Sequence, residues 1–174
     1  MTRLYVTRMI VPVLMLGLGP AAAWAEPGRE APATLAVAGI VYQQAVFGDD
    51  SPKTNHAIGP TLGVLFRGPR SGRTALTFEA MLQPRPAENP HYPESFAPFH
   101  LMAGAQIGRR TYTRLSGGIT SVGGVAPIVG LAIGAERPFG ATWLAGAEFV
   151  VRAGGVVGAA GAFAGAQFFL GSRH

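Results

Sequence analysis

The 174-residue sequence contains no cysteine and is poor in charge, with Asp, Glu, Lys and Arg making up only 13% of it. The missing cysteines exclude disulfide bonds, thiolate metal sites and thiol catalysis. A typical soluble domain carries about 25% charged residues. A chain with so little charge and 48% hydrophobic residues has few groups with which to cover a water-exposed surface. The composition therefore favours a lipid-facing surface.

Lysine and long apolar runs are also scarce. Of the 14 basic residues only Lys53 is a lysine. The arginines are scattered or lie at expected turns, without the basic stripe and interleaved aromatics typical of nucleic-acid binding. After residue 25 no apolar run reaches the roughly 20 residues of a spanning helix. Gly161 and Gly165 have the GxxxG spacing of helix contacts, but the glycine-rich segment around them disfavours a helix.

The first 25 residues have the pattern of a signal peptide. Arg3 and Arg8 give it a positive start, and residues 9–18 form an uncharged apolar run of the expected length. An A-x-A cleavage pattern ends at Ala25. We expect a removed signal peptide at 1–25, a short N-terminal segment at 26–33, the folded domain at 34–171 and a C-terminal tail at 172–174.

The remaining sequence alternates apolar and polar residues with a period of two, as a strand with two different faces does. Within residues 58–67, Ile58, Leu62 and Phe66 share one face and Arg67 lies on the other. Eight such segments of about ten residues follow one another, which is the length of a tilted membrane strand. They cover residues 34–47, 58–67, 75–83, 99–108, 111–119, 127–136, 143–152 and 160–170.

Every charged residue within these segments lies on the glycine-rich, polar face, and the opposite face is almost purely apolar. A soluble sandwich buries its apolar face, whereas a membrane barrel turns that face to lipid. The polar face has few Lys, Glu and Asp for a wetted surface, and aromatics gather near the segment ends, which favours the membrane. The aromatics expected at one interface are Phe66, Tyr112, Phe139, Trp143 and Phe168, and those at the other are Tyr42, Phe47 and Phe99.

This layout resembles the eight-stranded outer-membrane β-barrels, the class of the OmpA transmembrane domain and OmpX. The resemblance covers nearly all of the sequence after the leader. It implies an all-β fold: an antiparallel up-and-down membrane β-barrel, located in the bacterial outer membrane, with a polar interior filled by side chains and no open pore. It also implies outer-membrane lipids and the barrel-assembly machinery as partners, no cofactor, and a structural, adhesive or envelope-integrity role through the extracellular loops.

The charges on the inner face predict an ion-pair network, because a buried charge without a partner is strongly destabilising. Glu79 and Glu148 are expected near mid-height on strands that face each other across the ring. Gln83, Gln106 and Gln167 are expected to complete the hydrogen bonding. The predicted network comprises Arg67, Glu79, Arg114, Glu136, Glu148 and Arg152.

The connections are expected to alternate between short turns (68–72, 109–111 and 137–141) and longer loops, with both termini on the periplasmic side. The longer loops are 48–57, 84–98 and 120–126, and the last connection, 153–159, is short. Loop 84–98 holds five prolines, and stiff proline-rich segments with aromatics dock partners. We therefore expect a candidate site for an extracellular partner there, comprising His91, Tyr92 and Phe96.

Two other functions are open to the sequence: a lipid A-modifying barrel enzyme and a secreted soluble β-barrel that binds a small apolar ligand. His100 and Ser116 are expected on inward faces of neighbouring strands, roughly 13 Å apart at 3.3 Å per residue, which is too far for a nucleophile and its base. His91 and Ser95 lie close in sequence, as such residues often do by chance. The histidines have no paired spacing that indicates a metal site.

Overall fold

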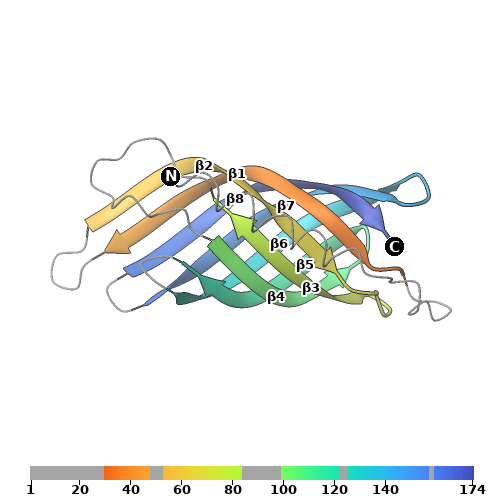
Figure 1. The fold of residues 1–174 in the computed structure, drawn as a ribbon, viewed down its shortest axis with the longest axis horizontal. Helices are drawn as coiled ribbons and strands as arrows, with labels where there is room; N and C mark the ends of the chain where they lie inside the picture. Colours follow the sequence, from red (N-terminus) through yellow and green to blue (C-terminus); the bar gives the residue numbers. More distant parts are fainter. Residues whose placement is uncertain (1–29, 48–52, 84–98, 122–124, 157–158) are drawn as a thin grey trace, which may run out of the picture.

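The structure is a computed structural model, and it describes residues 30–47, 53–83, 99–121, 125–156 and 159–174. These residues form one closed antiparallel barrel in which each strand pairs with the next and the last pairs with the first. The predicted eight-stranded all-β barrel is thereby confirmed. Figure 1 shows the strands crossing the long axis of the barrel obliquely. They are β1 (Ala33–Phe47), β2 (Lys53–Arg67), β3 (Thr74–Leu82), β4 (Phe99–Gly108), β5 (Thr111–Thr120), β6 (Ala126–Phe139), β7 (Trp143–Val156) and β8 (Ala159–Arg173).

The two ends of the barrel differ in their connections. At one end, here called the turn end, lie the turns 68–73, 109–110 and 140–142, together with the start of β1 and the end of β8. Gly72 and Gly140 have φ angles of 63° and 67° in two of these turns, a left-handed conformation that glycine adopts without a steric penalty. The opposite end, here called the loop end, holds the remaining connections, 48–52, 83–98, 121–125 and 157–158.

Several strands are longer than the alternation predicts. Lys53 pairs with Phe47, so the expected long loop 48–57 is wrong and only 48–52 connects the two strands. The expected connection 153–159 is also wrong, because β7 reaches Val156 and β8 begins at Ala159. β8 continues to Arg173, opposite Ala33, so two residues expected in the tail lie in the strand. Main-chain pairing continues past the apolar pattern because backbone hydrogen bonds do not require apolar side chains.

The apolar face of the strands points outward. Leu76 is 73% exposed, Ile133 60% and Phe168 65%, whereas Glu79 and Arg114 are 2% exposed. Along β3 buried side chains alternate with more exposed ones. The predicted assignment of the two faces is therefore confirmed: oily residues cover the outside, and the charged residues lie within.

One of the expected interfacial aromatics is misplaced. Tyr112 is only 4% exposed, because it shares the inward face of β5 with Arg114, two residues further on. The side chain of Phe47 is outside the described set. The other expected aromatics are exposed on the outer surface, as Phe78 and Phe149 also are: Tyr42, Phe66, Phe99, Phe139, Trp143 and Phe168.

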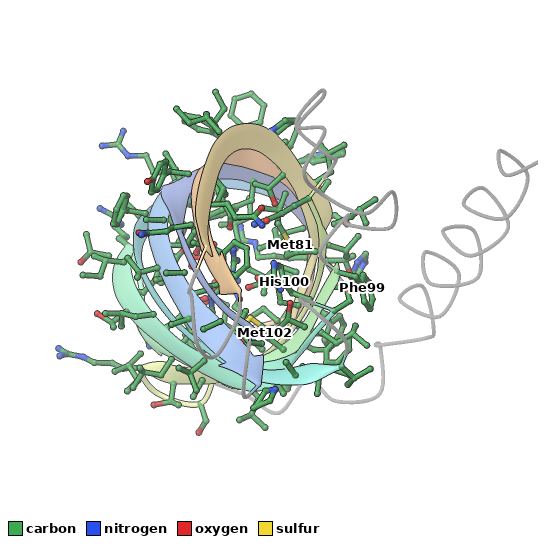
Figure 2. All side chains as sticks on the ribbon, turned by 90° about the vertical axis from the view of Figure 1, so that its left-hand side faces the viewer. Met81, Phe99, His100 and Met102 are labelled. Atoms are coloured by element: carbon green, nitrogen blue, oxygen red, sulfur yellow. The ribbon has the colours of Figure 1, made fainter. Side chains whose placement is uncertain are left out.

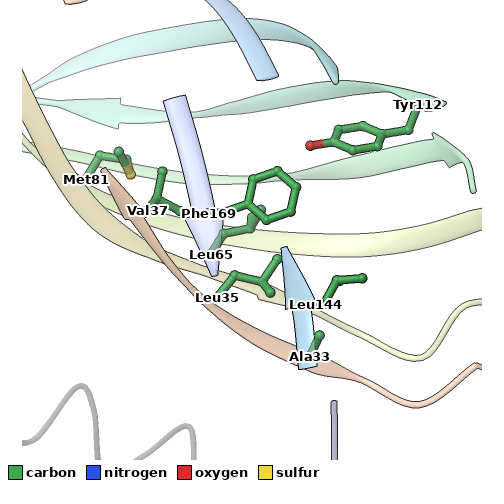
Figure 3. Packing of buried hydrophobic residues seen from close by; sticks show 8 residues of the cluster. All are labelled: Ala33, Leu35, Val37, Leu65, Met81, Tyr112, Leu144 and Phe169. Atoms are coloured by element: carbon green, nitrogen blue, oxygen red, sulfur yellow. The ribbon is translucent and has the colours of Figure 1, made fainter. Parts of the chain in front are cut away.

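Inward-facing glycines provide the space for two large rings. A Cβ on Gly134 would lie 2.6 Å from the Tyr112 hydroxyl oxygen, and a Cβ on Gly146 would lie 2.2 Å from Cζ of Phe169. The two ring centroids are 6.5 Å apart. Figure 3 shows both rings within an apolar cluster of the interior. The cluster comprises Ala33, Leu35, Val37, Leu65, Met81, Tyr112, Leu144 and Phe169.

We predict that Gly146→Ala destabilises the barrel by about 1–3 kcal/mol, the usual cost of overpacking. The added methyl group would meet the Phe169 ring and the Ala135 carbonyl oxygen at 2.3 Å. Gly117→Ala is the matched control, because Gly117 is exposed and its Cβ would meet only the Ile128 carbonyl oxygen, at 3.8 Å. Thermal unfolding in detergent, followed by circular dichroism, compares the two. Equal unfolding temperatures would contradict the steric argument.

Candidate functional site

The candidate site is the charged interior of the barrel. All six charged residues that the sequence places on the inner face are buried, and Arg70 joins them. They come from β2, β3, β5, β6 and β7, and Arg70 from the turn after β2. Each is at most 5% exposed: Arg67, Arg70, Glu79, Arg114, Glu136, Glu148 and Arg152.

Four of these residues form a group at mid-barrel, here called the central group. Glu79 on β3 accepts hydrogen bonds or ion-pair contacts from two guanidinium groups: Nη1 of Arg114 lies 2.8 Å away, and Nη2 of Arg152 contacts the other carboxylate oxygen. Arg114 also donates to Glu148. Because Arg152 and Glu148 lie on β7 and Glu79 on β3, the group crosses the lumen between strands on opposite sides of the barrel.

Neutral polar groups complete the central group. The Tyr112 hydroxyl donates to Glu148 at 2.8 Å. The Gln167 amide fits best when its nitrogen donates to Glu148 and its oxygen accepts from Arg152, both at 3.3 Å. Each carboxylate therefore has more than one donor, which a buried charge requires if its desolvation is to be offset.

A second group lies at the turn end and is here called the end group. Glu136 accepts from Nη1 of Arg67 through both oxygens, at 2.7 and 2.6 Å, and from Nη2 of Arg70 at 2.9 Å. Gln106 donates to it at 3.4 Å. Glu30, which is 29% exposed, lies 3.1 Å from Arg70 and 3.6 Å from Arg67. The contacts thus divide the expected single network into two groups.

Sequence reasoning missed Glu30, Arg70 and Tyr112. Glu30 and Arg70 lie outside the alternating segments, where no periodicity indicates which way a side chain points. With Glu30 and Arg70 included, the two groups contain four arginines and four glutamates, and Nη1 of a fifth arginine, Arg173, lies 3.9 Å from Glu30. Of the expected amide partners, Gln83 has no hydrogen bond through its Nε2 to the residues described.

His100 and Ser116, which were weighed for catalysis, do not come together. Ser116 is opposite Gly104 and His100 is opposite Thr120, so the two are four positions apart, as predicted. His100 is fully buried and packs edge-on against Phe163, with ring centroids 4.9 Å apart. Figure 2 looks in from the loop end and shows His100 inside the barrel with Met81 and Met102, and Phe99 outside.

The remaining candidates are the site in the proline-rich loop and a metal site. The expected loop site of His91, Tyr92 and Phe96 lies outside the described residues. Across the described ranges no three His, Asp or Glu residues gather as a metal site would require. None of the described residues belongs to a helix long and apolar enough to cross a membrane.

Comparison with known proteins identifies the fold. No family model matches the chain, and no curated protein matches its sequence. Neisserial surface protein A (NspA) is similar in structure, with a TM-score of 0.50 and 11% identity over 82% of this chain and 98% of NspA. Ail, the attachment invasion locus protein of Yersinia pestis, has a TM-score of 0.49 and 13% identity over 83% of this chain and 99% of Ail. The fold is that of the small eight-stranded outer-membrane β-barrels.

We predict that Glu79 and Arg152 are energetically coupled. Glu79→Gln leaves two buried guanidinium groups short of a carboxylate, and breaking a buried pair costs about 3–5 kcal/mol. The double variant that also carries Arg152→Met should lose less stability than the two single variants lose together. The difference, which is the coupling energy, should be about 0.5–3 kcal/mol. Urea titration of the folded barrel in lipid vesicles measures the free energies of unfolding.

The matched control combines Glu79→Gln with Arg137→Gln, because Arg137 is exposed on the outer surface. This pair should be additive. Additivity in the Glu79 and Arg152 cycle as well would contradict a direct interaction across the lumen.

Proposed function

We propose that this chain is a bacterial outer-membrane protein whose closed barrel sits in the bilayer and serves a structural, adhesive or envelope-integrity role through its loops. The observation that carries the proposal is the inverted burial: buried arginines and glutamates inside, large apolar side chains outside. Such an arrangement suits hydrocarbon, in which the closed barrel satisfies every backbone polar group.

The apolar surface continues around the whole barrel. Soluble monomers rarely expose contiguous apolar patches larger than a few hundred Å². Here every strand contributes at least one large apolar side chain that is more than half exposed. Contact of this surface with water on all sides would therefore be unfavourable. Examples, one from each strand in order, are Ile40, Ile58, Leu76, Ile107, Leu115, Ile133, Phe149 and Phe168.

Aromatic side chains flank this apolar belt. Phe139 and Trp143 lie opposite each other at the turn end, 73% and 49% exposed. Tyr42 and Phe99 lie towards the loop end, 44% and 41% exposed. Outer-membrane barrels carry aromatic girdles at both interfaces, which supports a bilayer position between these two levels.

The interior argues against an open pore. Eight strands enclose a space only wide enough for side chains, and the central group crosses it from β3 to β7. A secreted barrel with a small apolar ligand fits less well, because an apolar ligand requires an apolar cavity and this lumen is crossed by ion pairs. The function therefore belongs to the parts outside the bilayer, among which the proline-rich connection 84–98, with His91, Tyr92 and Phe96, is our candidate for contact with an extracellular partner.

We predict that Leu115→Arg impairs folding into the membrane. Leu115 is 61% exposed in the middle of β5, where an arginine facing lipid costs about 2–4 kcal/mol. Val125→Arg is the control, because Val125 lies at the loop end and is 76% exposed, near an interface where the cost is about 0–1 kcal/mol. The readout is the heat-modifiable folded band in outer-membrane fractions on unboiled gels. A wild-type protein released without detergent, or a neutral Leu115→Arg, would refute the membrane location, since arginine is harmless on a wetted surface.

We also predict that the folded barrel produces no stepwise ion conductance in planar lipid bilayers, because the central group fills the lumen. A porin added to the same bilayer verifies that channels are detectable. Reproducible conductance steps that scale with salt concentration would show that the lumen opens.

A further inference from the structure

A second charged surface lies outside the barrel, at the turn end. Four arginines there are exposed. Arg73 ends the turn before β3, Arg109 and Arg110 form the turn between β4 and β5, and Arg137 lies near the end of β6. We call Arg73, Arg109, Arg110 and Arg137 the arginine arc.

The arc is continuous because backbone contacts join its three parts. The Gly108 N–H donates to the Arg73 carbonyl at 2.8 Å, and the Glu136 N–H donates to the Arg110 carbonyl at 2.8 Å. Nε of Arg109 donates to the Gly72 carbonyl at 3.3 Å. These bonds hold the turn after β2, the turn after β4 and the end of β6 side by side, so the four exposed arginines come from neighbouring positions along the turn end.

The arc has no acidic counterpart in the described part of the chain. The carboxylates at this end, Glu30 and Glu136, contact Arg67, Arg70 and Arg173, and none of the described salt bridges includes an arc residue. The sequence of the loop end has the opposite balance, because the connections 48–52 and 84–98 contain four acids and one base: Asp49, Asp50, Glu88, Glu94 and Arg85. Among the described residues, the arc is thus a positive surface at the turn end whose arginines have no carboxylate partner.

The aromatic residues give the depth of the arc. Arg137 points outward on β6, two residues before Phe139, which pairs with Trp143. Exposed aromatics of this kind lie at the level of the lipid headgroups. Arginine lays its apolar stem along the apolar surface and extends its guanidinium to the interface. The arc therefore lies where lipid phosphates lie.

We propose that the arginine arc binds the phosphate groups of anionic glycerophospholipids in the leaflet at the turn end. The proposal rests on the membrane location proposed above. Guanidinium groups bind phosphate through paired hydrogen bonds, and each basic side chain near an anionic surface strengthens binding roughly fivefold. Four neighbouring arginines therefore select anionic over zwitterionic headgroups.

Trp143 is a built-in reporter for this selection. The sequence has two tryptophans, Trp24 in the leader and Trp143 beside the arc, so the full chain with Trp24→Phe has one fluorophore at the relevant depth. This protein is reconstituted in two sets of phosphatidylcholine vesicles. One set contains a small fraction of phosphatidylglycerol with brominated acyl chains, and the other contains the same fraction of phosphatidylcholine with brominated acyl chains. Bromine quenches tryptophan on contact, so the ratio of the two quenching efficiencies reports the local enrichment of the anionic lipid.

We expect brominated phosphatidylglycerol to quench several-fold more efficiently than brominated phosphatidylcholine. Changing all four arc residues to glutamine should bring the ratio to about one, and Arg137→Gln alone should lower it in part. Lys53→Gln removes a cation from the loop end and should leave the ratio unchanged. Inorganic phosphate should lower the ratio no more than chloride at equal ionic strength, since the arc is proposed to bind phosphate held in the lipid surface.

The outcomes separate this proposal from the one it rests on. Quenching by neither lipid would overturn the membrane location and the arc together. Equal quenching by both lipids, or a ratio unchanged in the fourfold variant, would leave the barrel in the membrane and overturn the arc. Specific competition by inorganic phosphate would assign the arc to a free anion instead of a lipid surface.

Discussion

The contact of Glu79 with Arg114 and Arg152 is the interaction on which the rest of the molecule depends. It spans a lumen that eight strands leave only wide enough for side chains, and all three side chains are buried away from the solvent around the barrel. The narrowness also explains the glycines: Tyr112 and Phe169 fit inside because Gly134 and Gly146 present no side chain to them. Both ion pairs and apolar side chains therefore fill the lumen.

Inside and outside follow different electrostatic rules. The central group balances two arginines against two glutamates, each at most 4% exposed, so it stabilises the fold without presenting charge to a partner. The exposed arginines of the turn end have no such balance in the described structure and face whatever surrounds the barrel. Arginine therefore occurs in two settings in this barrel. The inner arginines are buried and contact a carboxylate, whereas the arginines of the arc are exposed and contact none of the described carboxylates. Arg70 and Arg73, three positions apart in one turn, illustrate the difference: the first contacts Glu136 and Glu30, the second is exposed.

Much of this was predictable because a strand has a strict period of two. Placing Arg67 on the polar face determines for every residue of its strand whether the side chain points inward or outward. The same reasoning on the other strands identifies the six inner charges. The pairing among them was not predictable, because it depends on the tilt of the strands and the rotation of each around the axis. Glu30 and Arg70 lie outside the alternation, and Lys53 extends β2 through main-chain bonds that leave no trace in side-chain polarity. Tyr112 lies near a strand end, where an interfacial aromatic is expected, but it is two residues from Arg114 and therefore shares the inward face of β5.

The seam between β1 and β8 joins the two most distant parts of the folded chain: Ala33 pairs with Arg173, and the His174 N–H donates to the Pro32 carbonyl at 2.9 Å. Until β8 arrives, β1 and β7 are the edges of an open sheet whose unpaired N–H and C=O groups lipid cannot satisfy. A partly assembled sheet is therefore unstable in hydrocarbon, and closure and insertion must be completed together. The β1–β8 contact, which is the most non-local pairing in the barrel, is therefore the one that leaves no strand edge unpaired.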